Sequence, residues 1–248
     1  MNRRDKTAKK VMNIKKQKNS DSKPKCNKGN DCKKVLDIKD IISFTDHSET
    51  RAYIEANFKN GHFADEYEFM ECLKGIAKQG DPIMQNILGI CFIIGYGCEE
   101  NPHEALKWWT KAAEQEDLCS QRSLGSCYYY GEKGLRKNYK KATYWLEQAA
   151  LQNDDESQFM LGVCHYNGQG VKKSREKAFE CFKMAAESGH SDAQYHIANY
   201  YLNGCIVEKD VMEAWKWFTM AAEQGQEGAI RFVNSILDSV RKDQEDLG

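Results

Sequence analysis

Ten cysteines and six histidines are the side chains of this 248-residue chain that could act as nucleophiles, metal ligands or disulfide partners. Three pairs lie close together along the chain: Cys26 with Cys32, Cys164 with His165, and His190 with His196. A nucleophile and its base need a third group that orients the base, and a structural zinc ion needs a full set of ligands. None of the pairs has such groups beside it. We therefore predict no catalytic residue, no metal site and no cofactor.

The elements that must hold these side chains recur as a unit of 36 or 37 residues. An apolar residue followed by a small one opens each unit, at Leu88-Gly89, Leu124-Gly125, Leu161-Gly162 and Ile197-Ala198. A turn glycine follows at Gly95, Gly131, Gly168 and Gly204. An Ala and a bulky pair come next, at Ala105 with Trp108-Trp109, Ala142 with Trp145-Leu146, Ala178 with Cys181-Phe182, and Ala214 with Trp217-Phe218. Columns that recur in register predict a repeat architecture.

One unit is predicted to be two helices joined by a glycine-rich turn. Ser120, Leu124 and Cys127 follow the i, i+4, i+7 spacing of one helical stripe. The second helix starts near Pro102, Tyr139, Ser174 or Asp210, and Ser and Asp suit helix N-caps whereas Pro suits the first turn. A hairpin of this size cannot bury both apolar faces alone, so neighbouring hairpins must stack. The sequence thus predicts an all-α fold, a right-handed α-α superhelical solenoid, with Leu124 and Trp145 in its core.

The repeated cassette resembles the Sel1-like repeats, relatives of the tetratricopeptide repeats. The third unit carries it most fully, at Leu161, Gly162, His165, Gly168, Lys177, Ala178, Phe182, Ala185, Ala186 and Gly189. The resemblance covers roughly residues 81 to 227, as repeats at 81–118, 119–154, 155–191 and 192–227. Departures are His165 in place of an aromatic residue, the loss of Leu-Gly at Ile197-Ala198, and Gly134 one residue late. We expect a degenerate capping repeat within residues 35–80 and a C-terminal capping helix and tail at 228–248.

The cysteine spacing predicts buried thiols. Cys91, Cys127 and Cys164 occupy one column of successive equivalent helices, which pack about 8 to 10 Å apart axis to axis. A disulfide needs Cα atoms within roughly 7 Å. Cys72 and Cys181 fall in the aromatic column of the second helix and are interpreted in the same way. Because the chain also shows no secretory signal, we expect a reducing compartment and no structural disulfide.

Residues 1–34 differ from the rest in charge. They hold 13 basic and 3 acidic residues, whereas the remaining chain has 23 basic and 34 acidic residues. A segment this charged and this poor in apolar residues is predicted to be a disordered tail. It could bind nucleic acid or an anionic membrane surface, act as a nuclear localisation signal through Lys15, Lys16 and Lys18, fold back on the acidic repeats, or simply be solvated. No apolar stretch approaches the roughly 18 residues of a membrane span, and we expect a cytoplasmic or nuclear location.

The resemblance also implies an enzymatic alternative, a beta-lactamase-like hydrolase of the cysteine-rich Sel1-like type. Serine beta-lactamases use Ser-x-x-Lys together with Ser-Asp-Asn and Lys-Thr-Gly. Only the first pattern is present, at Ser174 with Lys177 and at Ser20 with Lys23. Ser174 stands where a helix cap belongs, so we interpret both as chance matches and predict that the protein is not an enzyme.

The leading hypothesis is an adaptor or scaffold that binds a peptide or protein partner, because a solenoid offers a long concave surface and no deep pocket. The first helices present a second face that is too apolar and aromatic for simple exposure. The partner-binding candidates on it are Asn86, Arg122, Tyr129, Phe159, Tyr166, Tyr195 and Asn199. Packing against the next repeat is the alternative reading of this face, and it is strongest for Ile90 and Val163. Tyr joins an apolar body to a polar tip, which favours the binding reading for the tyrosines.

Overall fold

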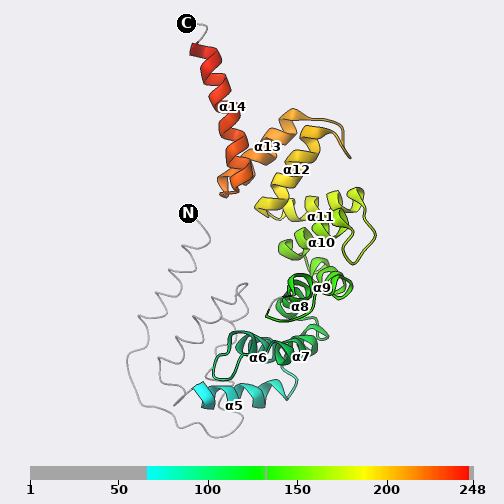
Figure 1. Cartoon of the computed structure of the whole chain (residues 1–248), viewed down its shortest axis with the longest axis vertical. Helices are drawn as coiled ribbons and strands as arrows, with labels where there is room; N and C mark the ends of the chain where they lie inside the picture. The colour runs from blue at the N-terminus through cyan, green and yellow to red at the C-terminus, as the bar shows by residue number, and fades with distance from the viewer. Residues whose placement is uncertain (1–65, 132, 246–248) are drawn as a thin grey trace. The chain divides into compact units, whose positions relative to one another are not determined.

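The computed structural model describes residues 66–131 and 133–245, and in that part of the chain every regular element is an α-helix (Figure 1). Residues 73–245, apart from residue 132, belong to one compact unit. The expectation of an all-α fold is confirmed for the described residues. The helices are α5 (Glu66–Ala77), α6 (Pro82–Ile94), α7 (Pro102–Ala113), α8 (Leu118–Tyr130), α9 (Tyr139–Leu151), α10 (Asp155–Asn167), α11 (Arg175–Glu187), α12 (Ser191–Asn203), α13 (Val211–Glu223) and α14 (Glu227–Glu245). The tail at 1–34 lies outside the described residues.

Helices α6 to α13 form four hairpins that stack in sequence order (Figure 1). Within a hairpin, α6 packs on α7, α8 on α9, α10 on α11, and α12 on α13. Between hairpins, each second helix packs on the first helix of the next unit, and α13 packs on α14 in the same way. The predicted solenoid of stacked helical hairpins is therefore confirmed.

The helices begin and end where the residue types require. Pro102 is the first residue of α7, and the side chains of Ser174 and Asp210 cap α11 and α13 by accepting hydrogen bonds from backbone N–H groups. Every first helix of a hairpin ends at a glycine in the left-handed region, with φ of 68° at Gly95 and 77° at Gly168. Only glycine adopts that conformation without steric cost, so the turn glycines fix where the chain reverses.

A close approach of backbone and side chain holds the two helices together in each of the first three hairpins. A Cβ atom added to Gly89 would lie 2.5 Å from Trp109, and one added to Gly162 would lie 2.7 Å from Phe182. The second unit repeats the contact with Gly125 and Leu146, again at 2.7 Å. The first helix thus has a notch that only a missing side chain provides, and the second helix fills it with a large one.

Only one member of each bulky pair fills this notch. Trp109, Leu146, Phe182 and Phe218 are almost completely buried. Trp145, expected in the core, is half-buried and packs against the edge of a cluster that contains the fully buried Leu124. Neighbouring residues on a helix point about 100° apart, so both members of a pair cannot face the same notch.

Buried glutamines form a second set of contacts, which the sequence analysis did not identify. The glutamine at the fourth position of each first helix donates to an alanine carbonyl of the preceding helix: Gln85 to Ala77, Gln121 to Ala113, Gln158 to Ala150 and Gln194 to Ala186. In three units its carbonyl accepts from a glutamine after the second helix: Gln115, Gln152 and Gln224. In these three units the glutamine therefore ties three helices together.

The third unit breaks this pattern. Ser188 stands where the other units have the donating glutamine, and its side chain is too short to reach Gln158. Among the described residues, no group donates to the buried Gln158 Oε1. A buried acceptor without a donor costs about 1 to 3 kcal/mol.

The cysteines agree with the sequence analysis except at one position. Cys91, Cys127 and Cys164 are buried thiols, as the column spacing predicts. Cys72 in α5, however, is disulfide-bonded, so the expectation of no structural disulfide is wrong. The other seven described cysteines are thiols, and the partner of Cys72 is not among them. Equivalent positions of stacked helices are too far apart to bond, but a cysteine outside that stack is not subject to this limit. With one disulfide present, the cysteines no longer favour a reducing compartment.

The notch gives a testable expectation at Gly162. Gly162→Ala should lower the free energy of unfolding by about 1 to 3 kcal/mol, because its Cβ would overlap the ring of Phe182. The matched control is Gly75→Ala in α5, where an added Cβ meets no atom within 4 Å. There the better helix propensity of Ala should raise stability by up to about 1 kcal/mol. Denaturant unfolding measures both, and equal gains at the two sites would contradict the notch.

The gap in the glutamine pattern predicts a stabilising substitution. Ser188→Gln should raise the free energy of unfolding by about 1 kcal/mol, because it supplies the donor that Gln158 Oε1 lacks. Ser188→Met has a side chain of similar length and no donor, so it serves as the control. If both substitutions stabilise the protein equally, packing and not the hydrogen bond is responsible.

Candidate functional site

The first-helix face is defined here by the seven candidates Asn86, Arg122, Tyr129, Phe159, Tyr166, Tyr195 and Asn199, which lie on α6, α8, α10 and α12. Their exposure differs. Tyr166 is exposed over 44% of its surface, Asn86 is 8% exposed, and the other five are partly buried. The face therefore offers a mixture of accessible and enclosed side chains.

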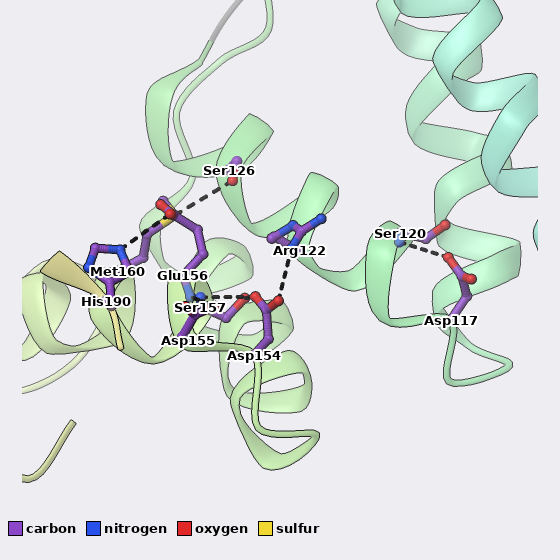
Figure 2. A network of polar contacts seen from close by, with 10 residues as sticks. All are labelled: Asp117, Ser120, Arg122, Ser126, Asp154, Asp155, Glu156, Ser157, Met160 and His190. Carbon is purple, nitrogen blue, oxygen red and sulfur yellow. Dashed lines mark hydrogen bonds and ion pairs between the residues drawn. The ribbon is translucent and has the colours of Figure 1, made fainter. Parts of the chain in front are cut away.

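Arg122 on α8 is committed to an ion pair with the next hairpin. Its Nη1 lies 2.9 Å from Oδ1 of Asp154, and both side chains are largely buried (Figure 2). Asp154 uses its other oxygen to cap α10, accepting from the backbone N–H of Ser157 at 3.0 Å and from its hydroxyl at 2.6 Å. Because one carboxylate holds three donors, the pair fixes α8 against the start of α10.

The cap position carries similar links at the later junctions. The residue before each first helix accepts a backbone N–H with its side chain, at Asp81, Asp117, Asp154, His190 and Gln226. From Asp154 onward, the same side chain also reaches the preceding first helix. His190 lies 3.4 Å from Glu156, and Gln226 donates to Asp192 at 3.2 Å. This row of caps connects first helix to first helix.

His190 is the one cap in this row whose charge changes near neutral pH. Its Nδ1 accepts from Ala193 N–H at 3.3 Å, so the neutral ring carries its proton on Nε2, which faces Oε2 of Glu156 (Figure 2). Burial alone would lower the pKa of His190, but the hydrogen bond and charge of Glu156 outweigh it and raise the pKa above its usual value. The bond to His190 lowers the pKa of the Glu156 carboxyl in turn.

Stacked aromatic rings also link the third and fourth hairpins. Phe159 stacks on His190 with 4.4 Å between ring centroids, and His196 stacks on Phe182 at 4.6 Å. Burial lowers the pKa of His196, so this ring stays neutral more readily than its neighbour. Tyr195 packs edge-on against Phe218 at 5.7 Å. Phe159 also lies 5.6 Å from Phe182 between ring centroids, so two of the predicted binding residues, Phe159 and Tyr195, contact the buried rings of the second helices.

The tyrosines at the ends of the first helices differ from each other. The hydroxyl of Tyr129 donates to Oε1 of Gln169 at 2.9 Å, and its ring packs against the cluster of Leu146, Met160 and Cys164. Tyr166, at the same position of the next unit, is exposed. Asn199 donates to the carbonyl of Tyr195 one turn earlier in its own helix. Of the seven candidates, Tyr166 is the most accessible.

Sequence reasoning missed the groups that brace this face. Asp154, Glu156, His190 and Gln169 each contact one of the candidates or its neighbour. The signal was present in part, because the capping residues recur every 36 or 37 residues like the glycines do. A column of changing residue types, from Asp to His to Gln, is harder to recognise than a column of glycines.

Two serines of this part of the chain use their hydroxyls in contacts at the starts of helices. Ser157 is completely buried, and its hydroxyl donates to a carboxylate that is already paired with Arg122. Ser174, the serine of the Ser-x-x-Lys match, caps α11 by accepting from Lys177 N–H and donates its hydroxyl to Glu176. The Ser174 hydroxyl caps a helix and the Ser157 hydroxyl binds the carboxylate that caps α10, whereas a nucleophile must be aligned with a base and reach a substrate.

Two searches of the described residues concern other classes of site. Within the described ranges, no group of three potential ligands from His, Cys, Asp and Glu gathers closely enough to hold a metal ion. The helices among these residues also include none with the length and apolar character needed to cross a bilayer.

Comparison with known families matches the repeats one by one. The model of the Sel1 repeat matches residues 82–117, 120–154, 155–190 and 191–226. Each match begins at or within two residues of the start of a first helix. None of the curated proteins compared with this chain matches it.

Two solved structures share the fold over most of the chain. One is a protective antigen of uropathogenic Escherichia coli displaying an SLR fold, 26% identical, with a TM-score of 0.67. The match covers 80% of this chain and 42% of the antigen, so the chain spans less than half of that protein. The other is a Sel1 repeat protein from Oxalobacter formigenes, 28% identical, with a TM-score of 0.65, covering 82% of this chain and 79% of the other.

The pair of His190 and Glu156 predicts a pH-dependent contribution to stability. Because the pKa of His190 is raised, the contribution is fully present below the ordinary histidine pKa of about 6.5 and is lost as the pH rises through the raised value. The stability difference between the wild type and Glu156→Gln should therefore be larger near pH 6 than near pH 8, by less than about 1 kcal/mol because Glu156 is half exposed.

Thermal unfolding at a series of pH values measures this difference, and NMR titration of the His190 ring checks its pKa directly. Glu223→Gln, which removes an exposed carboxylate from α13, is the control and should show no such dependence. A His190 pKa that does not fall in Glu156→Gln would contradict the pairing.

Proposed function

The chain belongs to the Sel1 repeat family, and on that premise we propose that it is a binding scaffold, not an enzyme, that holds a peptide or protein segment on its first-helix face. Proteins of this family generally mediate protein–protein interaction. Stacked hairpins present equivalent positions at regular intervals, which suits a ligand long enough to contact several of them.

The observation that carries the proposal is the bracing of partly buried side chains on this face. Arg122 is held by Asp154, Tyr129 by Gln169, and Phe159 by the ring of His190. A side chain already fixed in one rotamer loses little entropy when a partner binds, so such a surface is preorganised for recognition. The same contacts also join adjacent repeats, so each of these residues has a structural part as well.

Tyr166 is the residue whose substitution tests the proposal best. It is a large aromatic side chain with 44% of its surface exposed, and no ring stacking or hydrogen bond of its side chain is found among the described residues. Aromatic anchors of this kind carry much of the energy of protein interfaces. Asn86, at 8% exposed, has little surface to offer a partner, so in this proposal it lies behind the binding residues.

Partners captured on the immobilised chain and identified by mass spectrometry provide the ligand for the decisive measurement. With an identified partner, Tyr166→Ala should weaken binding by about 1 to 2 kcal/mol, because it removes an exposed aromatic anchor. Calorimetric titration measures the affinity, and circular dichroism verifies that the helices and the melting temperature are unchanged.

Tyr144→Ala is the matched control. Tyr144 is a similarly exposed tyrosine, at 55%, but it lies on the second helix α9. The proposal requires full affinity in this variant. Equal losses at Tyr144 and Tyr166, or none at Tyr166, would place the partner elsewhere.

A further inference from the structure

The helix α14 occupies the place of a fifth first helix. Gln226 caps its start by accepting from Ala229 N–H at 2.7 Å, as the earlier caps do. Ala229 is fully buried, and Phe232 stacks on Phe218 of α13 with 4.0 Å between ring centroids. One side of α14 thus packs on the fourth hairpin as the earlier first helices pack on the hairpins before them.

The other side of α14 carries the positions that a second helix covers in the earlier hairpins. Counting 36 residues back, these positions in α14 and α12 correspond as Ile230 to Gln194, Asn234 to Ala198, and Leu237 to Tyr201. In α12, Gln194 bonds to Gln224 beyond α13, and Ala198 and Tyr201 pack in a cluster with Phe218. In α14, Ile230 is 36% exposed and Leu237 is 42% exposed. No described helix covers this stripe.

The charges beside this stripe alternate in sign. Glu227, Arg231, Asp238 and Arg241 recur at intervals of four, seven and three residues, so they lie on one side of the helix close to Asn234. All four are exposed. Arg241 lies 3.5 Å from Asp238 within the helix, and these two side chains are 74% and 65% exposed.

Read from the other end of the helix, this series of charges has the opposite sign at each position, so two antiparallel copies of α14 bring opposite charges together. If a second α14 lies antiparallel with Asn234 opposite Asn234, a rise of about 1.5 Å per residue puts Glu227 level with Arg241 of the second copy. Arg231 then lies close to Asp238 of the second copy, and Ile230 meets Leu237 of the second copy. A parallel pair would instead bring like charges together, which is unfavourable.

We propose that the uncovered stripe of α14, formed by Ile230, Asn234 and Leu237, binds the same stripe of a second copy of this chain in antiparallel orientation. Asn234 lies at the two-fold axis, where its amide donates to and accepts from its counterpart. A polar residue at this point costs stability and fixes the register, as a buried Asn does in coiled coils. One helix contributes less surface than a standard interface, so the dimer is weak and depends on concentration.

Charge exchange tests the pairing directly. Arg231→Glu and Asp238→Arg should each raise the dimer dissociation constant by roughly tenfold, because each places like charges opposite one another twice in the dimer. The double variant restores opposite charges across the interface and should recover dimerisation. Arg231 and Asp238 are about two helical turns apart, so they do not pair within one helix and the recovery reports contact between copies.

Sedimentation velocity over about two decades of concentration, up to the high micromolar range, measures the association of the full chain and its variants. Leu237→Ser should also weaken the dimer, whereas Met212→Ser, which changes an exposed apolar residue on α13, should not. Circular dichroism confirms that each variant is folded. A wild-type chain that stays monomeric, a dimer insensitive to Leu237→Ser, or a double variant no better than the single ones would each overturn the proposal.

Discussion

The distance between the two helices of each hairpin is fixed by a large side chain that touches backbone. Gly162 and Phe182 illustrate it, since there is no room for even one methyl group between them. At that separation the following helix comes within reach of the preceding one, and the glutamine at the fourth position can bridge three helices. The fourth hairpin has Ala198 in place of glycine, packed in one cluster with Phe218, so one methyl group is accommodated at this hairpin.

The polar contacts between repeats are made by the residues that cap the first helices, and the apolar contacts of the notch are made by other residues. The caps of α10, α12 and α14 each bind the preceding first helix, through Asp154, His190 and Gln226. Buried or half-buried polar groups are unfavourable unless they are paired. Another alignment of one hairpin on the next would leave some of these groups unpaired, so few alignments are allowed. The apolar notch holds the two helices of a hairpin together, and the capping residues fix how one hairpin is aligned on the next.

The sequence was sufficient for the helices, the turns and the hairpins because glycine, proline and capping residues act locally. Gly95, Pro102 and Asp210 take the positions that their backbone preferences predict. The site was less predictable, because the burial of a side chain on the first-helix face depends on its neighbour in the next repeat. Tyr129 and Tyr166 hold the same column, but Tyr129 reaches Gln169 and Tyr166 remains exposed. The disulfide at Cys72 was not predicted, because the spacing of equivalent cysteines concerns only helices stacked in register.

The notch and the glutamine bond have a consequence for how such a chain changes in length. The notch of Gly125 and Leu146 is complete within one hairpin, and the bond from Gln121 to Ala113 needs only the end of whichever hairpin came before. A whole hairpin can therefore be duplicated or lost while the notch and the glutamine bond re-form at the new junction. The loss of a single helix would leave a notch unfilled and a glutamine without its carbonyl. The structure thus makes the hairpin, and not the helix, the unit by which an ancestral gene could have lengthened or shortened this protein without unfolding it.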